Sequence, residues 1–78
     1  MNCIIIDDSS VIRKQIESFI EKTDNLQWLG SYENPLKALK KLSDNTKIDL
    51  IFLDIELPDM SGLELLDNIN SNPIIIII

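Results

Sequence analysis

Residues 3–8 read CIIIDD, a short apolar run that ends in two carboxylates. Residues 48–54, IDLIFLD, repeat this form, and residues 74–78 are five consecutive isoleucines. Apolar runs of this length that are rich in β-branched residues are typical of strands buried on both faces of a parallel sheet. We therefore predict buried strands at residues 3–6, 48–53 and 74–78.

Amphipathic segments separate these apolar runs. Residues 11–22 show the i, i+4, i+7, i+8 spacing of a helix with one buried stripe. The predicted stripe consists of Ile12, Ile16, Phe19 and Ile20. The candidates for the N-cap of this helix are Asp8, Ser9 and Ser10.

The middle of the chain contains two further helix starts. Asn34-Pro35 predicts the first, because Asn is a favoured cap and the missing N–H of Pro costs nothing in a first turn. The predicted buried side of this helix consists of Leu36, Leu39 and Leu42. Residues 61–64, SGLE, form a capping box that predicts another helix. Residues 26–32 predict a more exposed edge strand, with Leu26, Trp28 and Tyr32 on one face.

The predicted order of elements is therefore βαβαβαβ. Strands that alternate with helices form a parallel sheet with right-handed crossovers and helices on both faces. In such sheets ligands bind beyond the carboxyl ends of the strands, where the strand order reverses. We predict an open, doubly wound α/β fold with its functional site at that edge.

The composition excludes several classes of function. A chain of 78 residues holds one domain at most, and 13 Asp+Glu against 7 Lys+Arg argue against nucleic-acid binding by this segment. The single cysteine, Cys3, allows no intrachain disulfide and fits a reducing cytosol. No apolar stretch approaches the length of a membrane helix, so we expect no membrane contact. Because histidine is absent, any chemistry must use carboxylates.

Three carboxylates stand directly after predicted strands. Asp7 and Asp8 follow the first strand, and Asp54 follows the third. If those strands are neighbours, the three side chains converge and repel one another, and a hard divalent cation relieves the repulsion. Mg²⁺ suits an all-oxygen pocket, and one of the carboxylates could also attack phosphorus. Taken alone, the Asp7-Asp8 pair is more simply explained as a solvated pair that caps the following helix.

A resemblance to a known family adds to this interpretation. The Asp7-Asp8 pair, together with residues 53–62, LDIELPDMSG, resembles the receiver domain of bacterial two-component response regulators. Residues 34–39, NPLKAL, are similar to receivers attached to LytTR-type DNA-binding domains. The resemblance implies a flavodoxin-like (CheY-like) sheet with strand order 2-1-3-4, in which residues 1–78 are the N-terminal part of a single receiver domain.

The resemblance also implies a role for individual residues. Asp54 would accept a phosphoryl group from a phosphohistidine of a sensor histidine kinase. Asp8 would bind Mg²⁺ directly and Asp7 would help through a water molecule. Asp54 and the backbone carbonyl of Glu56 would complete the protein ligands of the metal. The chain would be a cytoplasmic signalling module rather than an enzyme, with a DNA-binding output domain following it in its protein.

Two other functions compete with this one. A Mg²⁺-dependent phosphohydrolase of the haloacid-dehalogenase type would need an aspartate two residues after its nucleophile, where this chain has Glu56. A receiver-like interaction module would dock partners without being phosphorylated. Receivers carry a Thr or Ser after the fourth strand and a Lys after the fifth, beyond Ile78, so we expect residues 1–78 alone to be incompetent for full signalling. We also expect residues 74–78 to form an uncovered edge that associates with a second copy.

Overall fold

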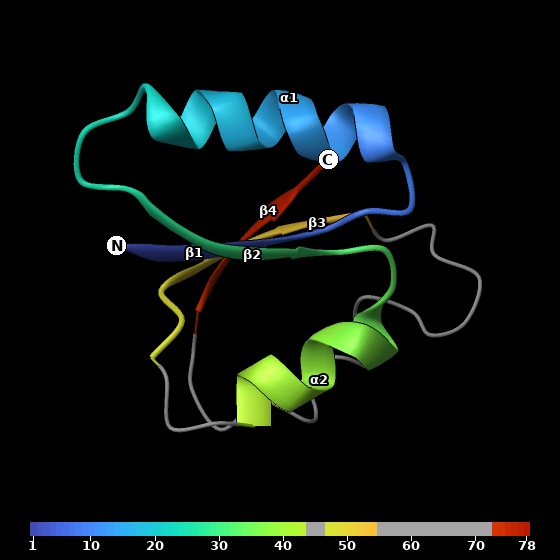
Figure 1. Cartoon of the computed structure of the whole chain (residues 1–78). Helices are drawn as coiled ribbons and strands as arrows, with labels where there is room; N and C mark the ends of the chain where they lie inside the picture. The colour runs from blue at the N-terminus through green and yellow to red at the C-terminus, as the bar shows by residue number, and fades with distance from the viewer. Residues whose placement is uncertain (44–46, 55–72) are drawn as a thin grey trace.

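The computed structural model describes residues 1–43, 47–54 and 73–78 of the chain (Figure 1). The described strands and helices are β1 (Asn2–Ile6), α1 (Ser10–Glu21), β2 (Gln27–Tyr32), α2 (Pro35–Ser43), β3 (Leu50–Leu53) and β4 (Ile74–Ile77). They alternate as predicted, although β3 begins two residues later than expected. The helix predicted from Ser61 lies outside the described residues.

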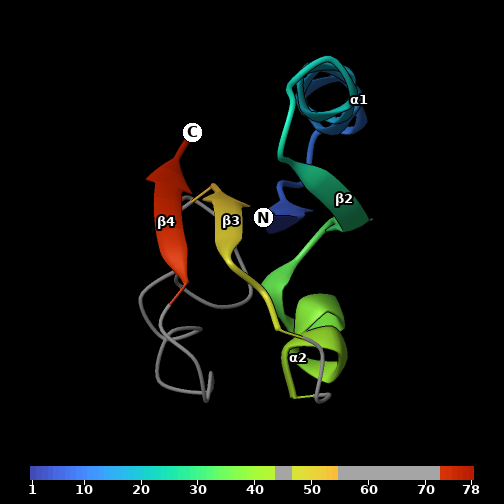
Figure 2. The ribbon, with the colours of Figure 1, turned by 90° about the vertical axis from the view of Figure 1, so that its left-hand side faces the viewer.

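The four strands form one parallel sheet in the order β2-β1-β3-β4. Helix α1 covers one face of this sheet and α2 covers the other (Figure 2). The doubly wound α/β fold and the strand order 2-1-3-4 are therefore confirmed. Because the chain leaves β1 toward β2 on one side and returns to β3 on the other, the strand order reverses at β1 and β3. Ligands of such sheets bind at the carboxyl ends of those two strands.

Strand β1 supplies the centre of the core. Its residues Cys3 to Ile6 have no exposed surface, and their side chains alternate between the two faces. On the α2 face the buried cluster consists of Ile4, Ile6, Ala38, Leu42, Ile48, Ile51 and Leu53. On the α1 face it consists of Cys3, Ile5, Ile20, Leu50 and Phe52. Burial raises the pKa of the Cys3 thiol, in keeping with the expectation that Cys3 is a packing residue.

Both helices start where the sequence predicts, but their buried faces are narrower. Helix α1 packs mainly on β1 and β2, so Ile20 is buried while Ile12 and Phe19 lie on its flank and are exposed. The Phe19 ring still contacts Phe52 of β3 edge-on, with 6.5 Å between the ring centroids. The predicted stripe therefore lies on the sheet-facing side of the helix, but Ile12 and Phe19 are less buried than predicted.

In α2 the prediction for Leu36 is wrong. Leu36 is 53% exposed, whereas Ala38 is fully buried. Two residues along a helix turn a side chain by about 200°, so Leu36 points away from the sheet when Ala38 points toward it. Leu42 is buried and Leu39 packs against the same cluster, as expected.

Strand β2 contains an irregularity that the alternation rule does not foresee. Cys3 pairs with Trp28, but the next residue, Ile4, pairs with Gly30, so the register skips Leu29. A single extra residue of this kind is a β-bulge and reverses the facing of the residues on either side of it. Leu26 consequently packs on the α1 face while Tyr32 packs on the α2 face, and the prediction of one shared face is wrong.

Candidate functional site

The site lies at the carboxyl ends of β1 and β3, where the backbone hydrogen bonds of the sheet continue into the aspartates themselves. The N–H of Asp7 donates to the carbonyl of Tyr32 at 3.0 Å, and the N–H of Asp54 donates to the carbonyl of Ile6 at 2.9 Å. The two Cα positions are therefore fixed by the sheet rather than by a loop. A site built on strands holds its geometry better than one built on loops.

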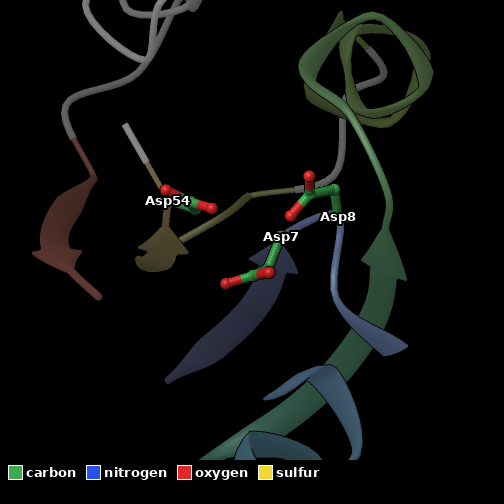
Figure 3. A group of neighbouring side chains, drawn as sticks. All are labelled: Asp7, Asp8 and Asp54. Carbon is green, nitrogen blue, oxygen red and sulfur yellow. The ribbon is translucent and has the colours of Figure 1, made fainter. Parts of the chain in front are cut away.

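The three predicted carboxylates converge, as Figure 3 shows. One oxygen from each of Asp7, Asp8 and Asp54 lies within 4.8 Å of the others. Asp7 is 5% exposed, Asp54 is half-buried and Asp8 is exposed, so the cluster runs from the sheet edge out to solvent. The prediction that the strand order brings these three residues together is confirmed.

The turn between β1 and α1 sets the direction of the Asp7 carboxylate. Asp7 Oδ1 accepts a hydrogen bond from the N–H of Ser9 at 2.8 Å. Ser9 is the N-cap of α1, because its Oγ accepts from the N–H of Ile12 at 3.3 Å. Of the three candidate caps, Ser9 is the one used, and neither aspartate caps the helix. The capping explanation for the Asp7-Asp8 pair is therefore not supported.

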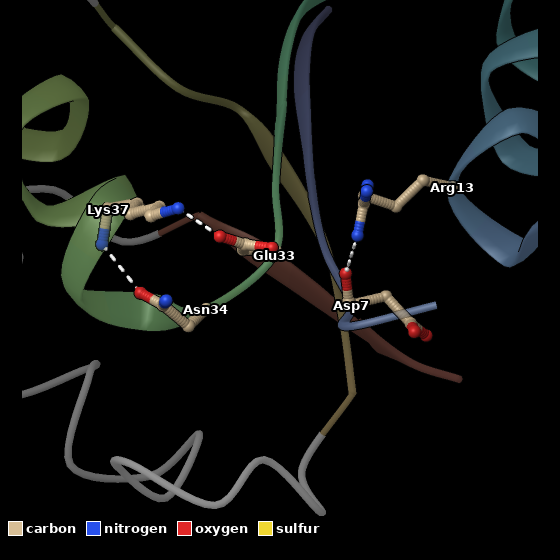
Figure 4. A network of polar contacts seen from close by, with 5 residues as sticks. All are labelled: Asp7, Arg13, Glu33, Asn34 and Lys37. Carbon is tan, nitrogen blue, oxygen red and sulfur yellow. Dashed lines mark hydrogen bonds and ion pairs between the residues drawn. The ribbon is translucent and has the colours of Figure 1, made fainter. Parts of the chain in front are cut away.

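Arg13 is a residue of this region that the sequence analysis missed. Its Nη1 donates a hydrogen bond to the backbone carbonyl of Asp7 at 2.7 Å (Figure 4). A signal was present, because Arg13 precedes Ile16 and Ile20 by three and seven residues and so shares their sheet-facing side of α1. A charged residue on that side needs a partner near the sheet.

The turn between β2 and α2 lies beside this region and carries its own charge pair. Asn34 Oδ1 accepts from the N–H of Lys37 at 2.9 Å, which confirms the predicted cap of α2. Lys37 also forms an ion pair with Glu33. The hydrogen bond from the Lys37 ammonium to the Glu33 carboxylate holds the pKa of the Glu33 carboxyl below its ordinary value. The positive charge of Arg13 adds a smaller attraction.

The donor set fits a hard divalent cation. Three carboxylates, no histidine and a distant, buried Cys3 exclude a zinc-type ligand set within the described part of the chain and match the oxygen ligands that Mg²⁺ prefers. Glu56, whose carbonyl was predicted as a further ligand, lies outside the described residues.

No helix among the described residues is long and apolar enough to cross a membrane.

Comparison with known proteins places this geometry in a family. The response regulator receiver domain matches residues 3–78. The sensory transduction protein LytR of Staphylococcus epidermidis is 39% identical over 70 residues, which are 90% of this chain and 27% of that protein. A protein-glutamate methylesterase/protein-glutamine glutaminase of Burkholderia thailandensis is 39% identical over 66 residues, 85% of this chain and 18% of that protein.

Solved structures agree with these relatives. The response regulatory domain of protein mrkE from Klebsiella pneumoniae superposes with a TM-score of 0.84 at 30% identity, covering 99% of this chain and 65% of that one. A structure of the P1 domain of CheA3 in complex with CheY6 from R. sphaeroides gives a TM-score of 0.78 at 36% identity, covering 97% of this chain and 59% of the matched one.

This chain spans between 18% and 36% of the length of the curated relatives it matches. The match nevertheless includes both strands that carry the acidic cluster and the turn that orients Asp7. The chain therefore belongs to the family of response regulator receiver domains.

Proposed function

We propose that residues 1–78 are the N-terminal part of one receiver domain, in which Asp54 is the phosphoacceptor and Asp7 and Asp8 hold Mg²⁺. The observation that carries this proposal is the convergence of the three carboxylates at the switch point of the sheet. Family membership supports it, because receiver domains typically bind Mg²⁺ through acidic residues. The proposed third ligand, the carbonyl of Glu56, completes an oxygen set of the kind that Mg²⁺ uses.

The chemistry assigned to Asp54 is a phosphoryl transfer. A carboxylate oxygen of Asp54 attacks phosphorus, a new O–P bond forms, and the N–P bond of the donor phosphohistidine breaks. The electron pair of that bond remains on the imidazole nitrogen, and the product is an aspartyl phosphate. Bound Mg²⁺ would supply positive charge that offsets the charge of the transferring group. Asp54 is suited to the attack because its backbone is fixed to Ile6 while its side chain stays partly accessible.

The proposed partners follow from what the similar proteins are. The R. sphaeroides complex joins a P1 domain of CheA3 to CheY6, and on that basis we assign a sensor histidine kinase as the phosphodonor for this chain. The similarity to LytR is the basis for proposing a DNA-binding output domain in the same protein. We place the protein in the cytoplasm, where the kinase would meet it.

Enzymatic alternatives are not favoured. The similarity to the methylesterase covers 18% of that protein and is a similarity of receiver domains, so it assigns no hydrolytic activity to this chain. The phosphohydrolase alternative has Glu56 where it needs an aspartate. The convergence of three carboxylates favours a phosphorylated receiver over one that only docks partners.

The decisive experiment is phosphorylation by a small-molecule phosphodonor in Mg²⁺, followed by mass spectrometry. It is run on a receiver that contains residues 1–78 and the region that follows them in related receivers, because the resemblance implies two further phosphoryl-binding residues there. One added phosphoryl group is expected, and Asp54→Asn should abolish it because an amide is a poor nucleophile. Asp24→Asn, in the exposed turn after α1, is the matched control and should be labelled normally. Equal labelling of Asp54→Asn would refute the assignment.

A further inference from the structure

We infer that Arg13 is a positioning residue for the cation site, holding the turn that carries Asp7 and Asp8 in the conformation that binds metal. This inference rests on the proposed function. It begins from an arrangement in which Arg13, a half-buried residue, donates to the backbone carbonyl of Asp7, a member of the acidic cluster.

Three hydrogen bonds join Asp7, Ser9 and Arg13 in a closed ring. The N–H of Ser9 donates to Asp7 Oδ1 at 2.8 Å, and the N–H of Arg13 donates to the carbonyl of Ser9 at 3.0 Å. Finally, Arg13 Nη1 donates a hydrogen bond to the carbonyl of Asp7 at 2.7 Å. The first two bonds belong to the turn and to the helix, and the third closes the ring through a side chain. Removing Arg13 therefore opens the ring at the residue that bears the buried carboxylate.

The position of the ring explains why it matters for binding. Asp7 is anchored on one side by its N–H bond to Tyr32 and on the other by Arg13, so both of its backbone polar groups are held. Asp8 is the next residue and its side chain is exposed, so the position of Asp8 depends on the conformation of this turn. Groups that orient metal ligands are commonly required for full affinity even though they do not contact the ion.

Charge and geometry predict opposite effects of removing Arg13, which makes the inference testable by sign. If Arg13 acted only through its charge, Arg13→Gln would remove a cation near three carboxylates and would tighten Mg²⁺ binding. If Arg13 positions the turn, Arg13→Gln weakens binding by roughly tenfold. Lys14→Gln removes the same charge from the next residue, which is exposed, and is the matched control.

The experiment is an Mg²⁺ titration of the 78-residue chain and its variants, followed by the backbone amide NMR signals of Asp7, Asp8 and Asp54. We expect Arg13→Gln to bind about tenfold more weakly than the wild type, in the range seen when ligand-orienting groups are lost. Lys14→Gln should not weaken binding. Arg13→Lys should give an intermediate affinity, because lysine keeps one donor at the end of a shorter chain. An unchanged or tighter affinity for Arg13→Gln would overturn the inference while leaving the metal site itself intact.

A second measurement needs no metal. Hydrogen exchange of the Ser9 amide, which donates to Asp7 Oδ1, should be faster in Arg13→Gln than in Lys14→Gln. If the wild-type chain binds no Mg²⁺, the proposed function fails, and equal Ser9 exchange in the two variants would overturn the Arg13 inference separately. Should Arg13→Gln unfold, Arg13→Lys takes its place, and wild-type values for both affinity and Ser9 exchange would overturn it.

Discussion

Strands β1 and β4 are built from the same kind of residue and lie in opposite environments. Ile4 to Ile6 of β1 are completely buried, whereas Ile74, Ile76 and Ile77 of β4 are between 39% and 57% exposed. Both strands pair with β3, but β1 also pairs with β2, while β4 has β3 as its sole neighbour among the described strands. A run of isoleucine thus decides that a segment is a strand, and its place in the sheet decides how much it stabilises the fold.

Truncating one isoleucine in each strand should give the largest difference. Ile5→Ala leaves a cavity among Cys3, Ile20 and Phe52, and large-to-small changes in a core cost about 2–5 kcal/mol. Ile76→Ala removes methyl groups that are already partly solvated, and should cost about 1 kcal/mol or less. Urea unfolding of both variants, followed by circular dichroism, measures the two free energies. Similar losses in the two would show that β4 is covered in solution.

The exposed edge of β4 should also affect association. Among the described strands the outer edge of β4 has no partner, and an uncharged strand edge of this kind is a template for pairing with a second copy. We therefore expect the chain to self-associate through residues 74–78. Ile76→Lys should shift association to roughly tenfold higher concentration, because a charged side chain on an edge strand disfavours edge-to-edge pairing.

Light scattering over a concentration series tests this expectation. Gln27→Lys places the same charge on β2, at the opposite edge of the sheet, and should leave association unchanged. A wild-type chain that stays monomeric and melts sharply at high concentration would contradict the prediction.

The sequence predicted where the strands lie because strand formation depends mostly on neighbouring residues. The acidic cluster was predictable because the resemblance to receiver domains also implied the strand order that makes β1 and β3 neighbours. The apolar composition of β1 and β3 is enough to predict that they are strands, and an aspartate directly after each strand must lie at the edge of the sheet. The depth of burial depends on distant elements and was not predictable. Phe19 and Leu36 have the spacing of core residues, yet both are exposed: Phe19 keeps a ring contact with Phe52 at the flank of α1, and Leu36 points away from the sheet. The bulge at Leu29 and the hydrogen bond from Arg13 to the carbonyl of Asp7 likewise depend on contacts between distant segments of the chain.

The carboxyl end of β1 should respond to charge removal in two opposite ways. Asp8→Asn removes one of three converging negative charges, so the metal-free chain should become more stable. The same change should weaken Mg²⁺ binding by at least roughly tenfold, because a carboxylate ligand is lost. Thermal melting with and without Mg²⁺ measures both effects. A variant that is less stable without metal would indicate that Asp8 supports the fold rather than the site.

At the amino end of the sheet one aspartate joins the two strands being compared. The N–H of Asp49 donates to the carbonyl of Asn2 in β1, and the carbonyl of Asp49 accepts from the N–H of Ile74 in β4, both at 2.9 Å. Its carboxylate accepts the N–H of Asn2 at 2.8 Å, with Lys47 Nζ 3.7 Å away. The hydrogen bond from Asn2, followed by the weaker attraction of Lys47, holds the pKa of Asp49 below its ordinary value.

The smallest predicted effect is a pH dependence at Asp49. Because the folded-state pKa lies below the unfolded value of about 3.9, the ionised carboxylate stabilises the fold above that pH. The contribution is lost as the pH falls through the lowered folded-state pKa. Asp49→Asn should therefore be less stable than the wild type at neutral pH, and the gap should close in acid. Urea unfolding across this range measures it, and Asp24→Asn, in the exposed turn after α1, corrects for the loss of one negative charge. A gap that persists unchanged in acid would mean that Asp49 acts through packing or its backbone, and that its carboxylate does not hold β1 against β3.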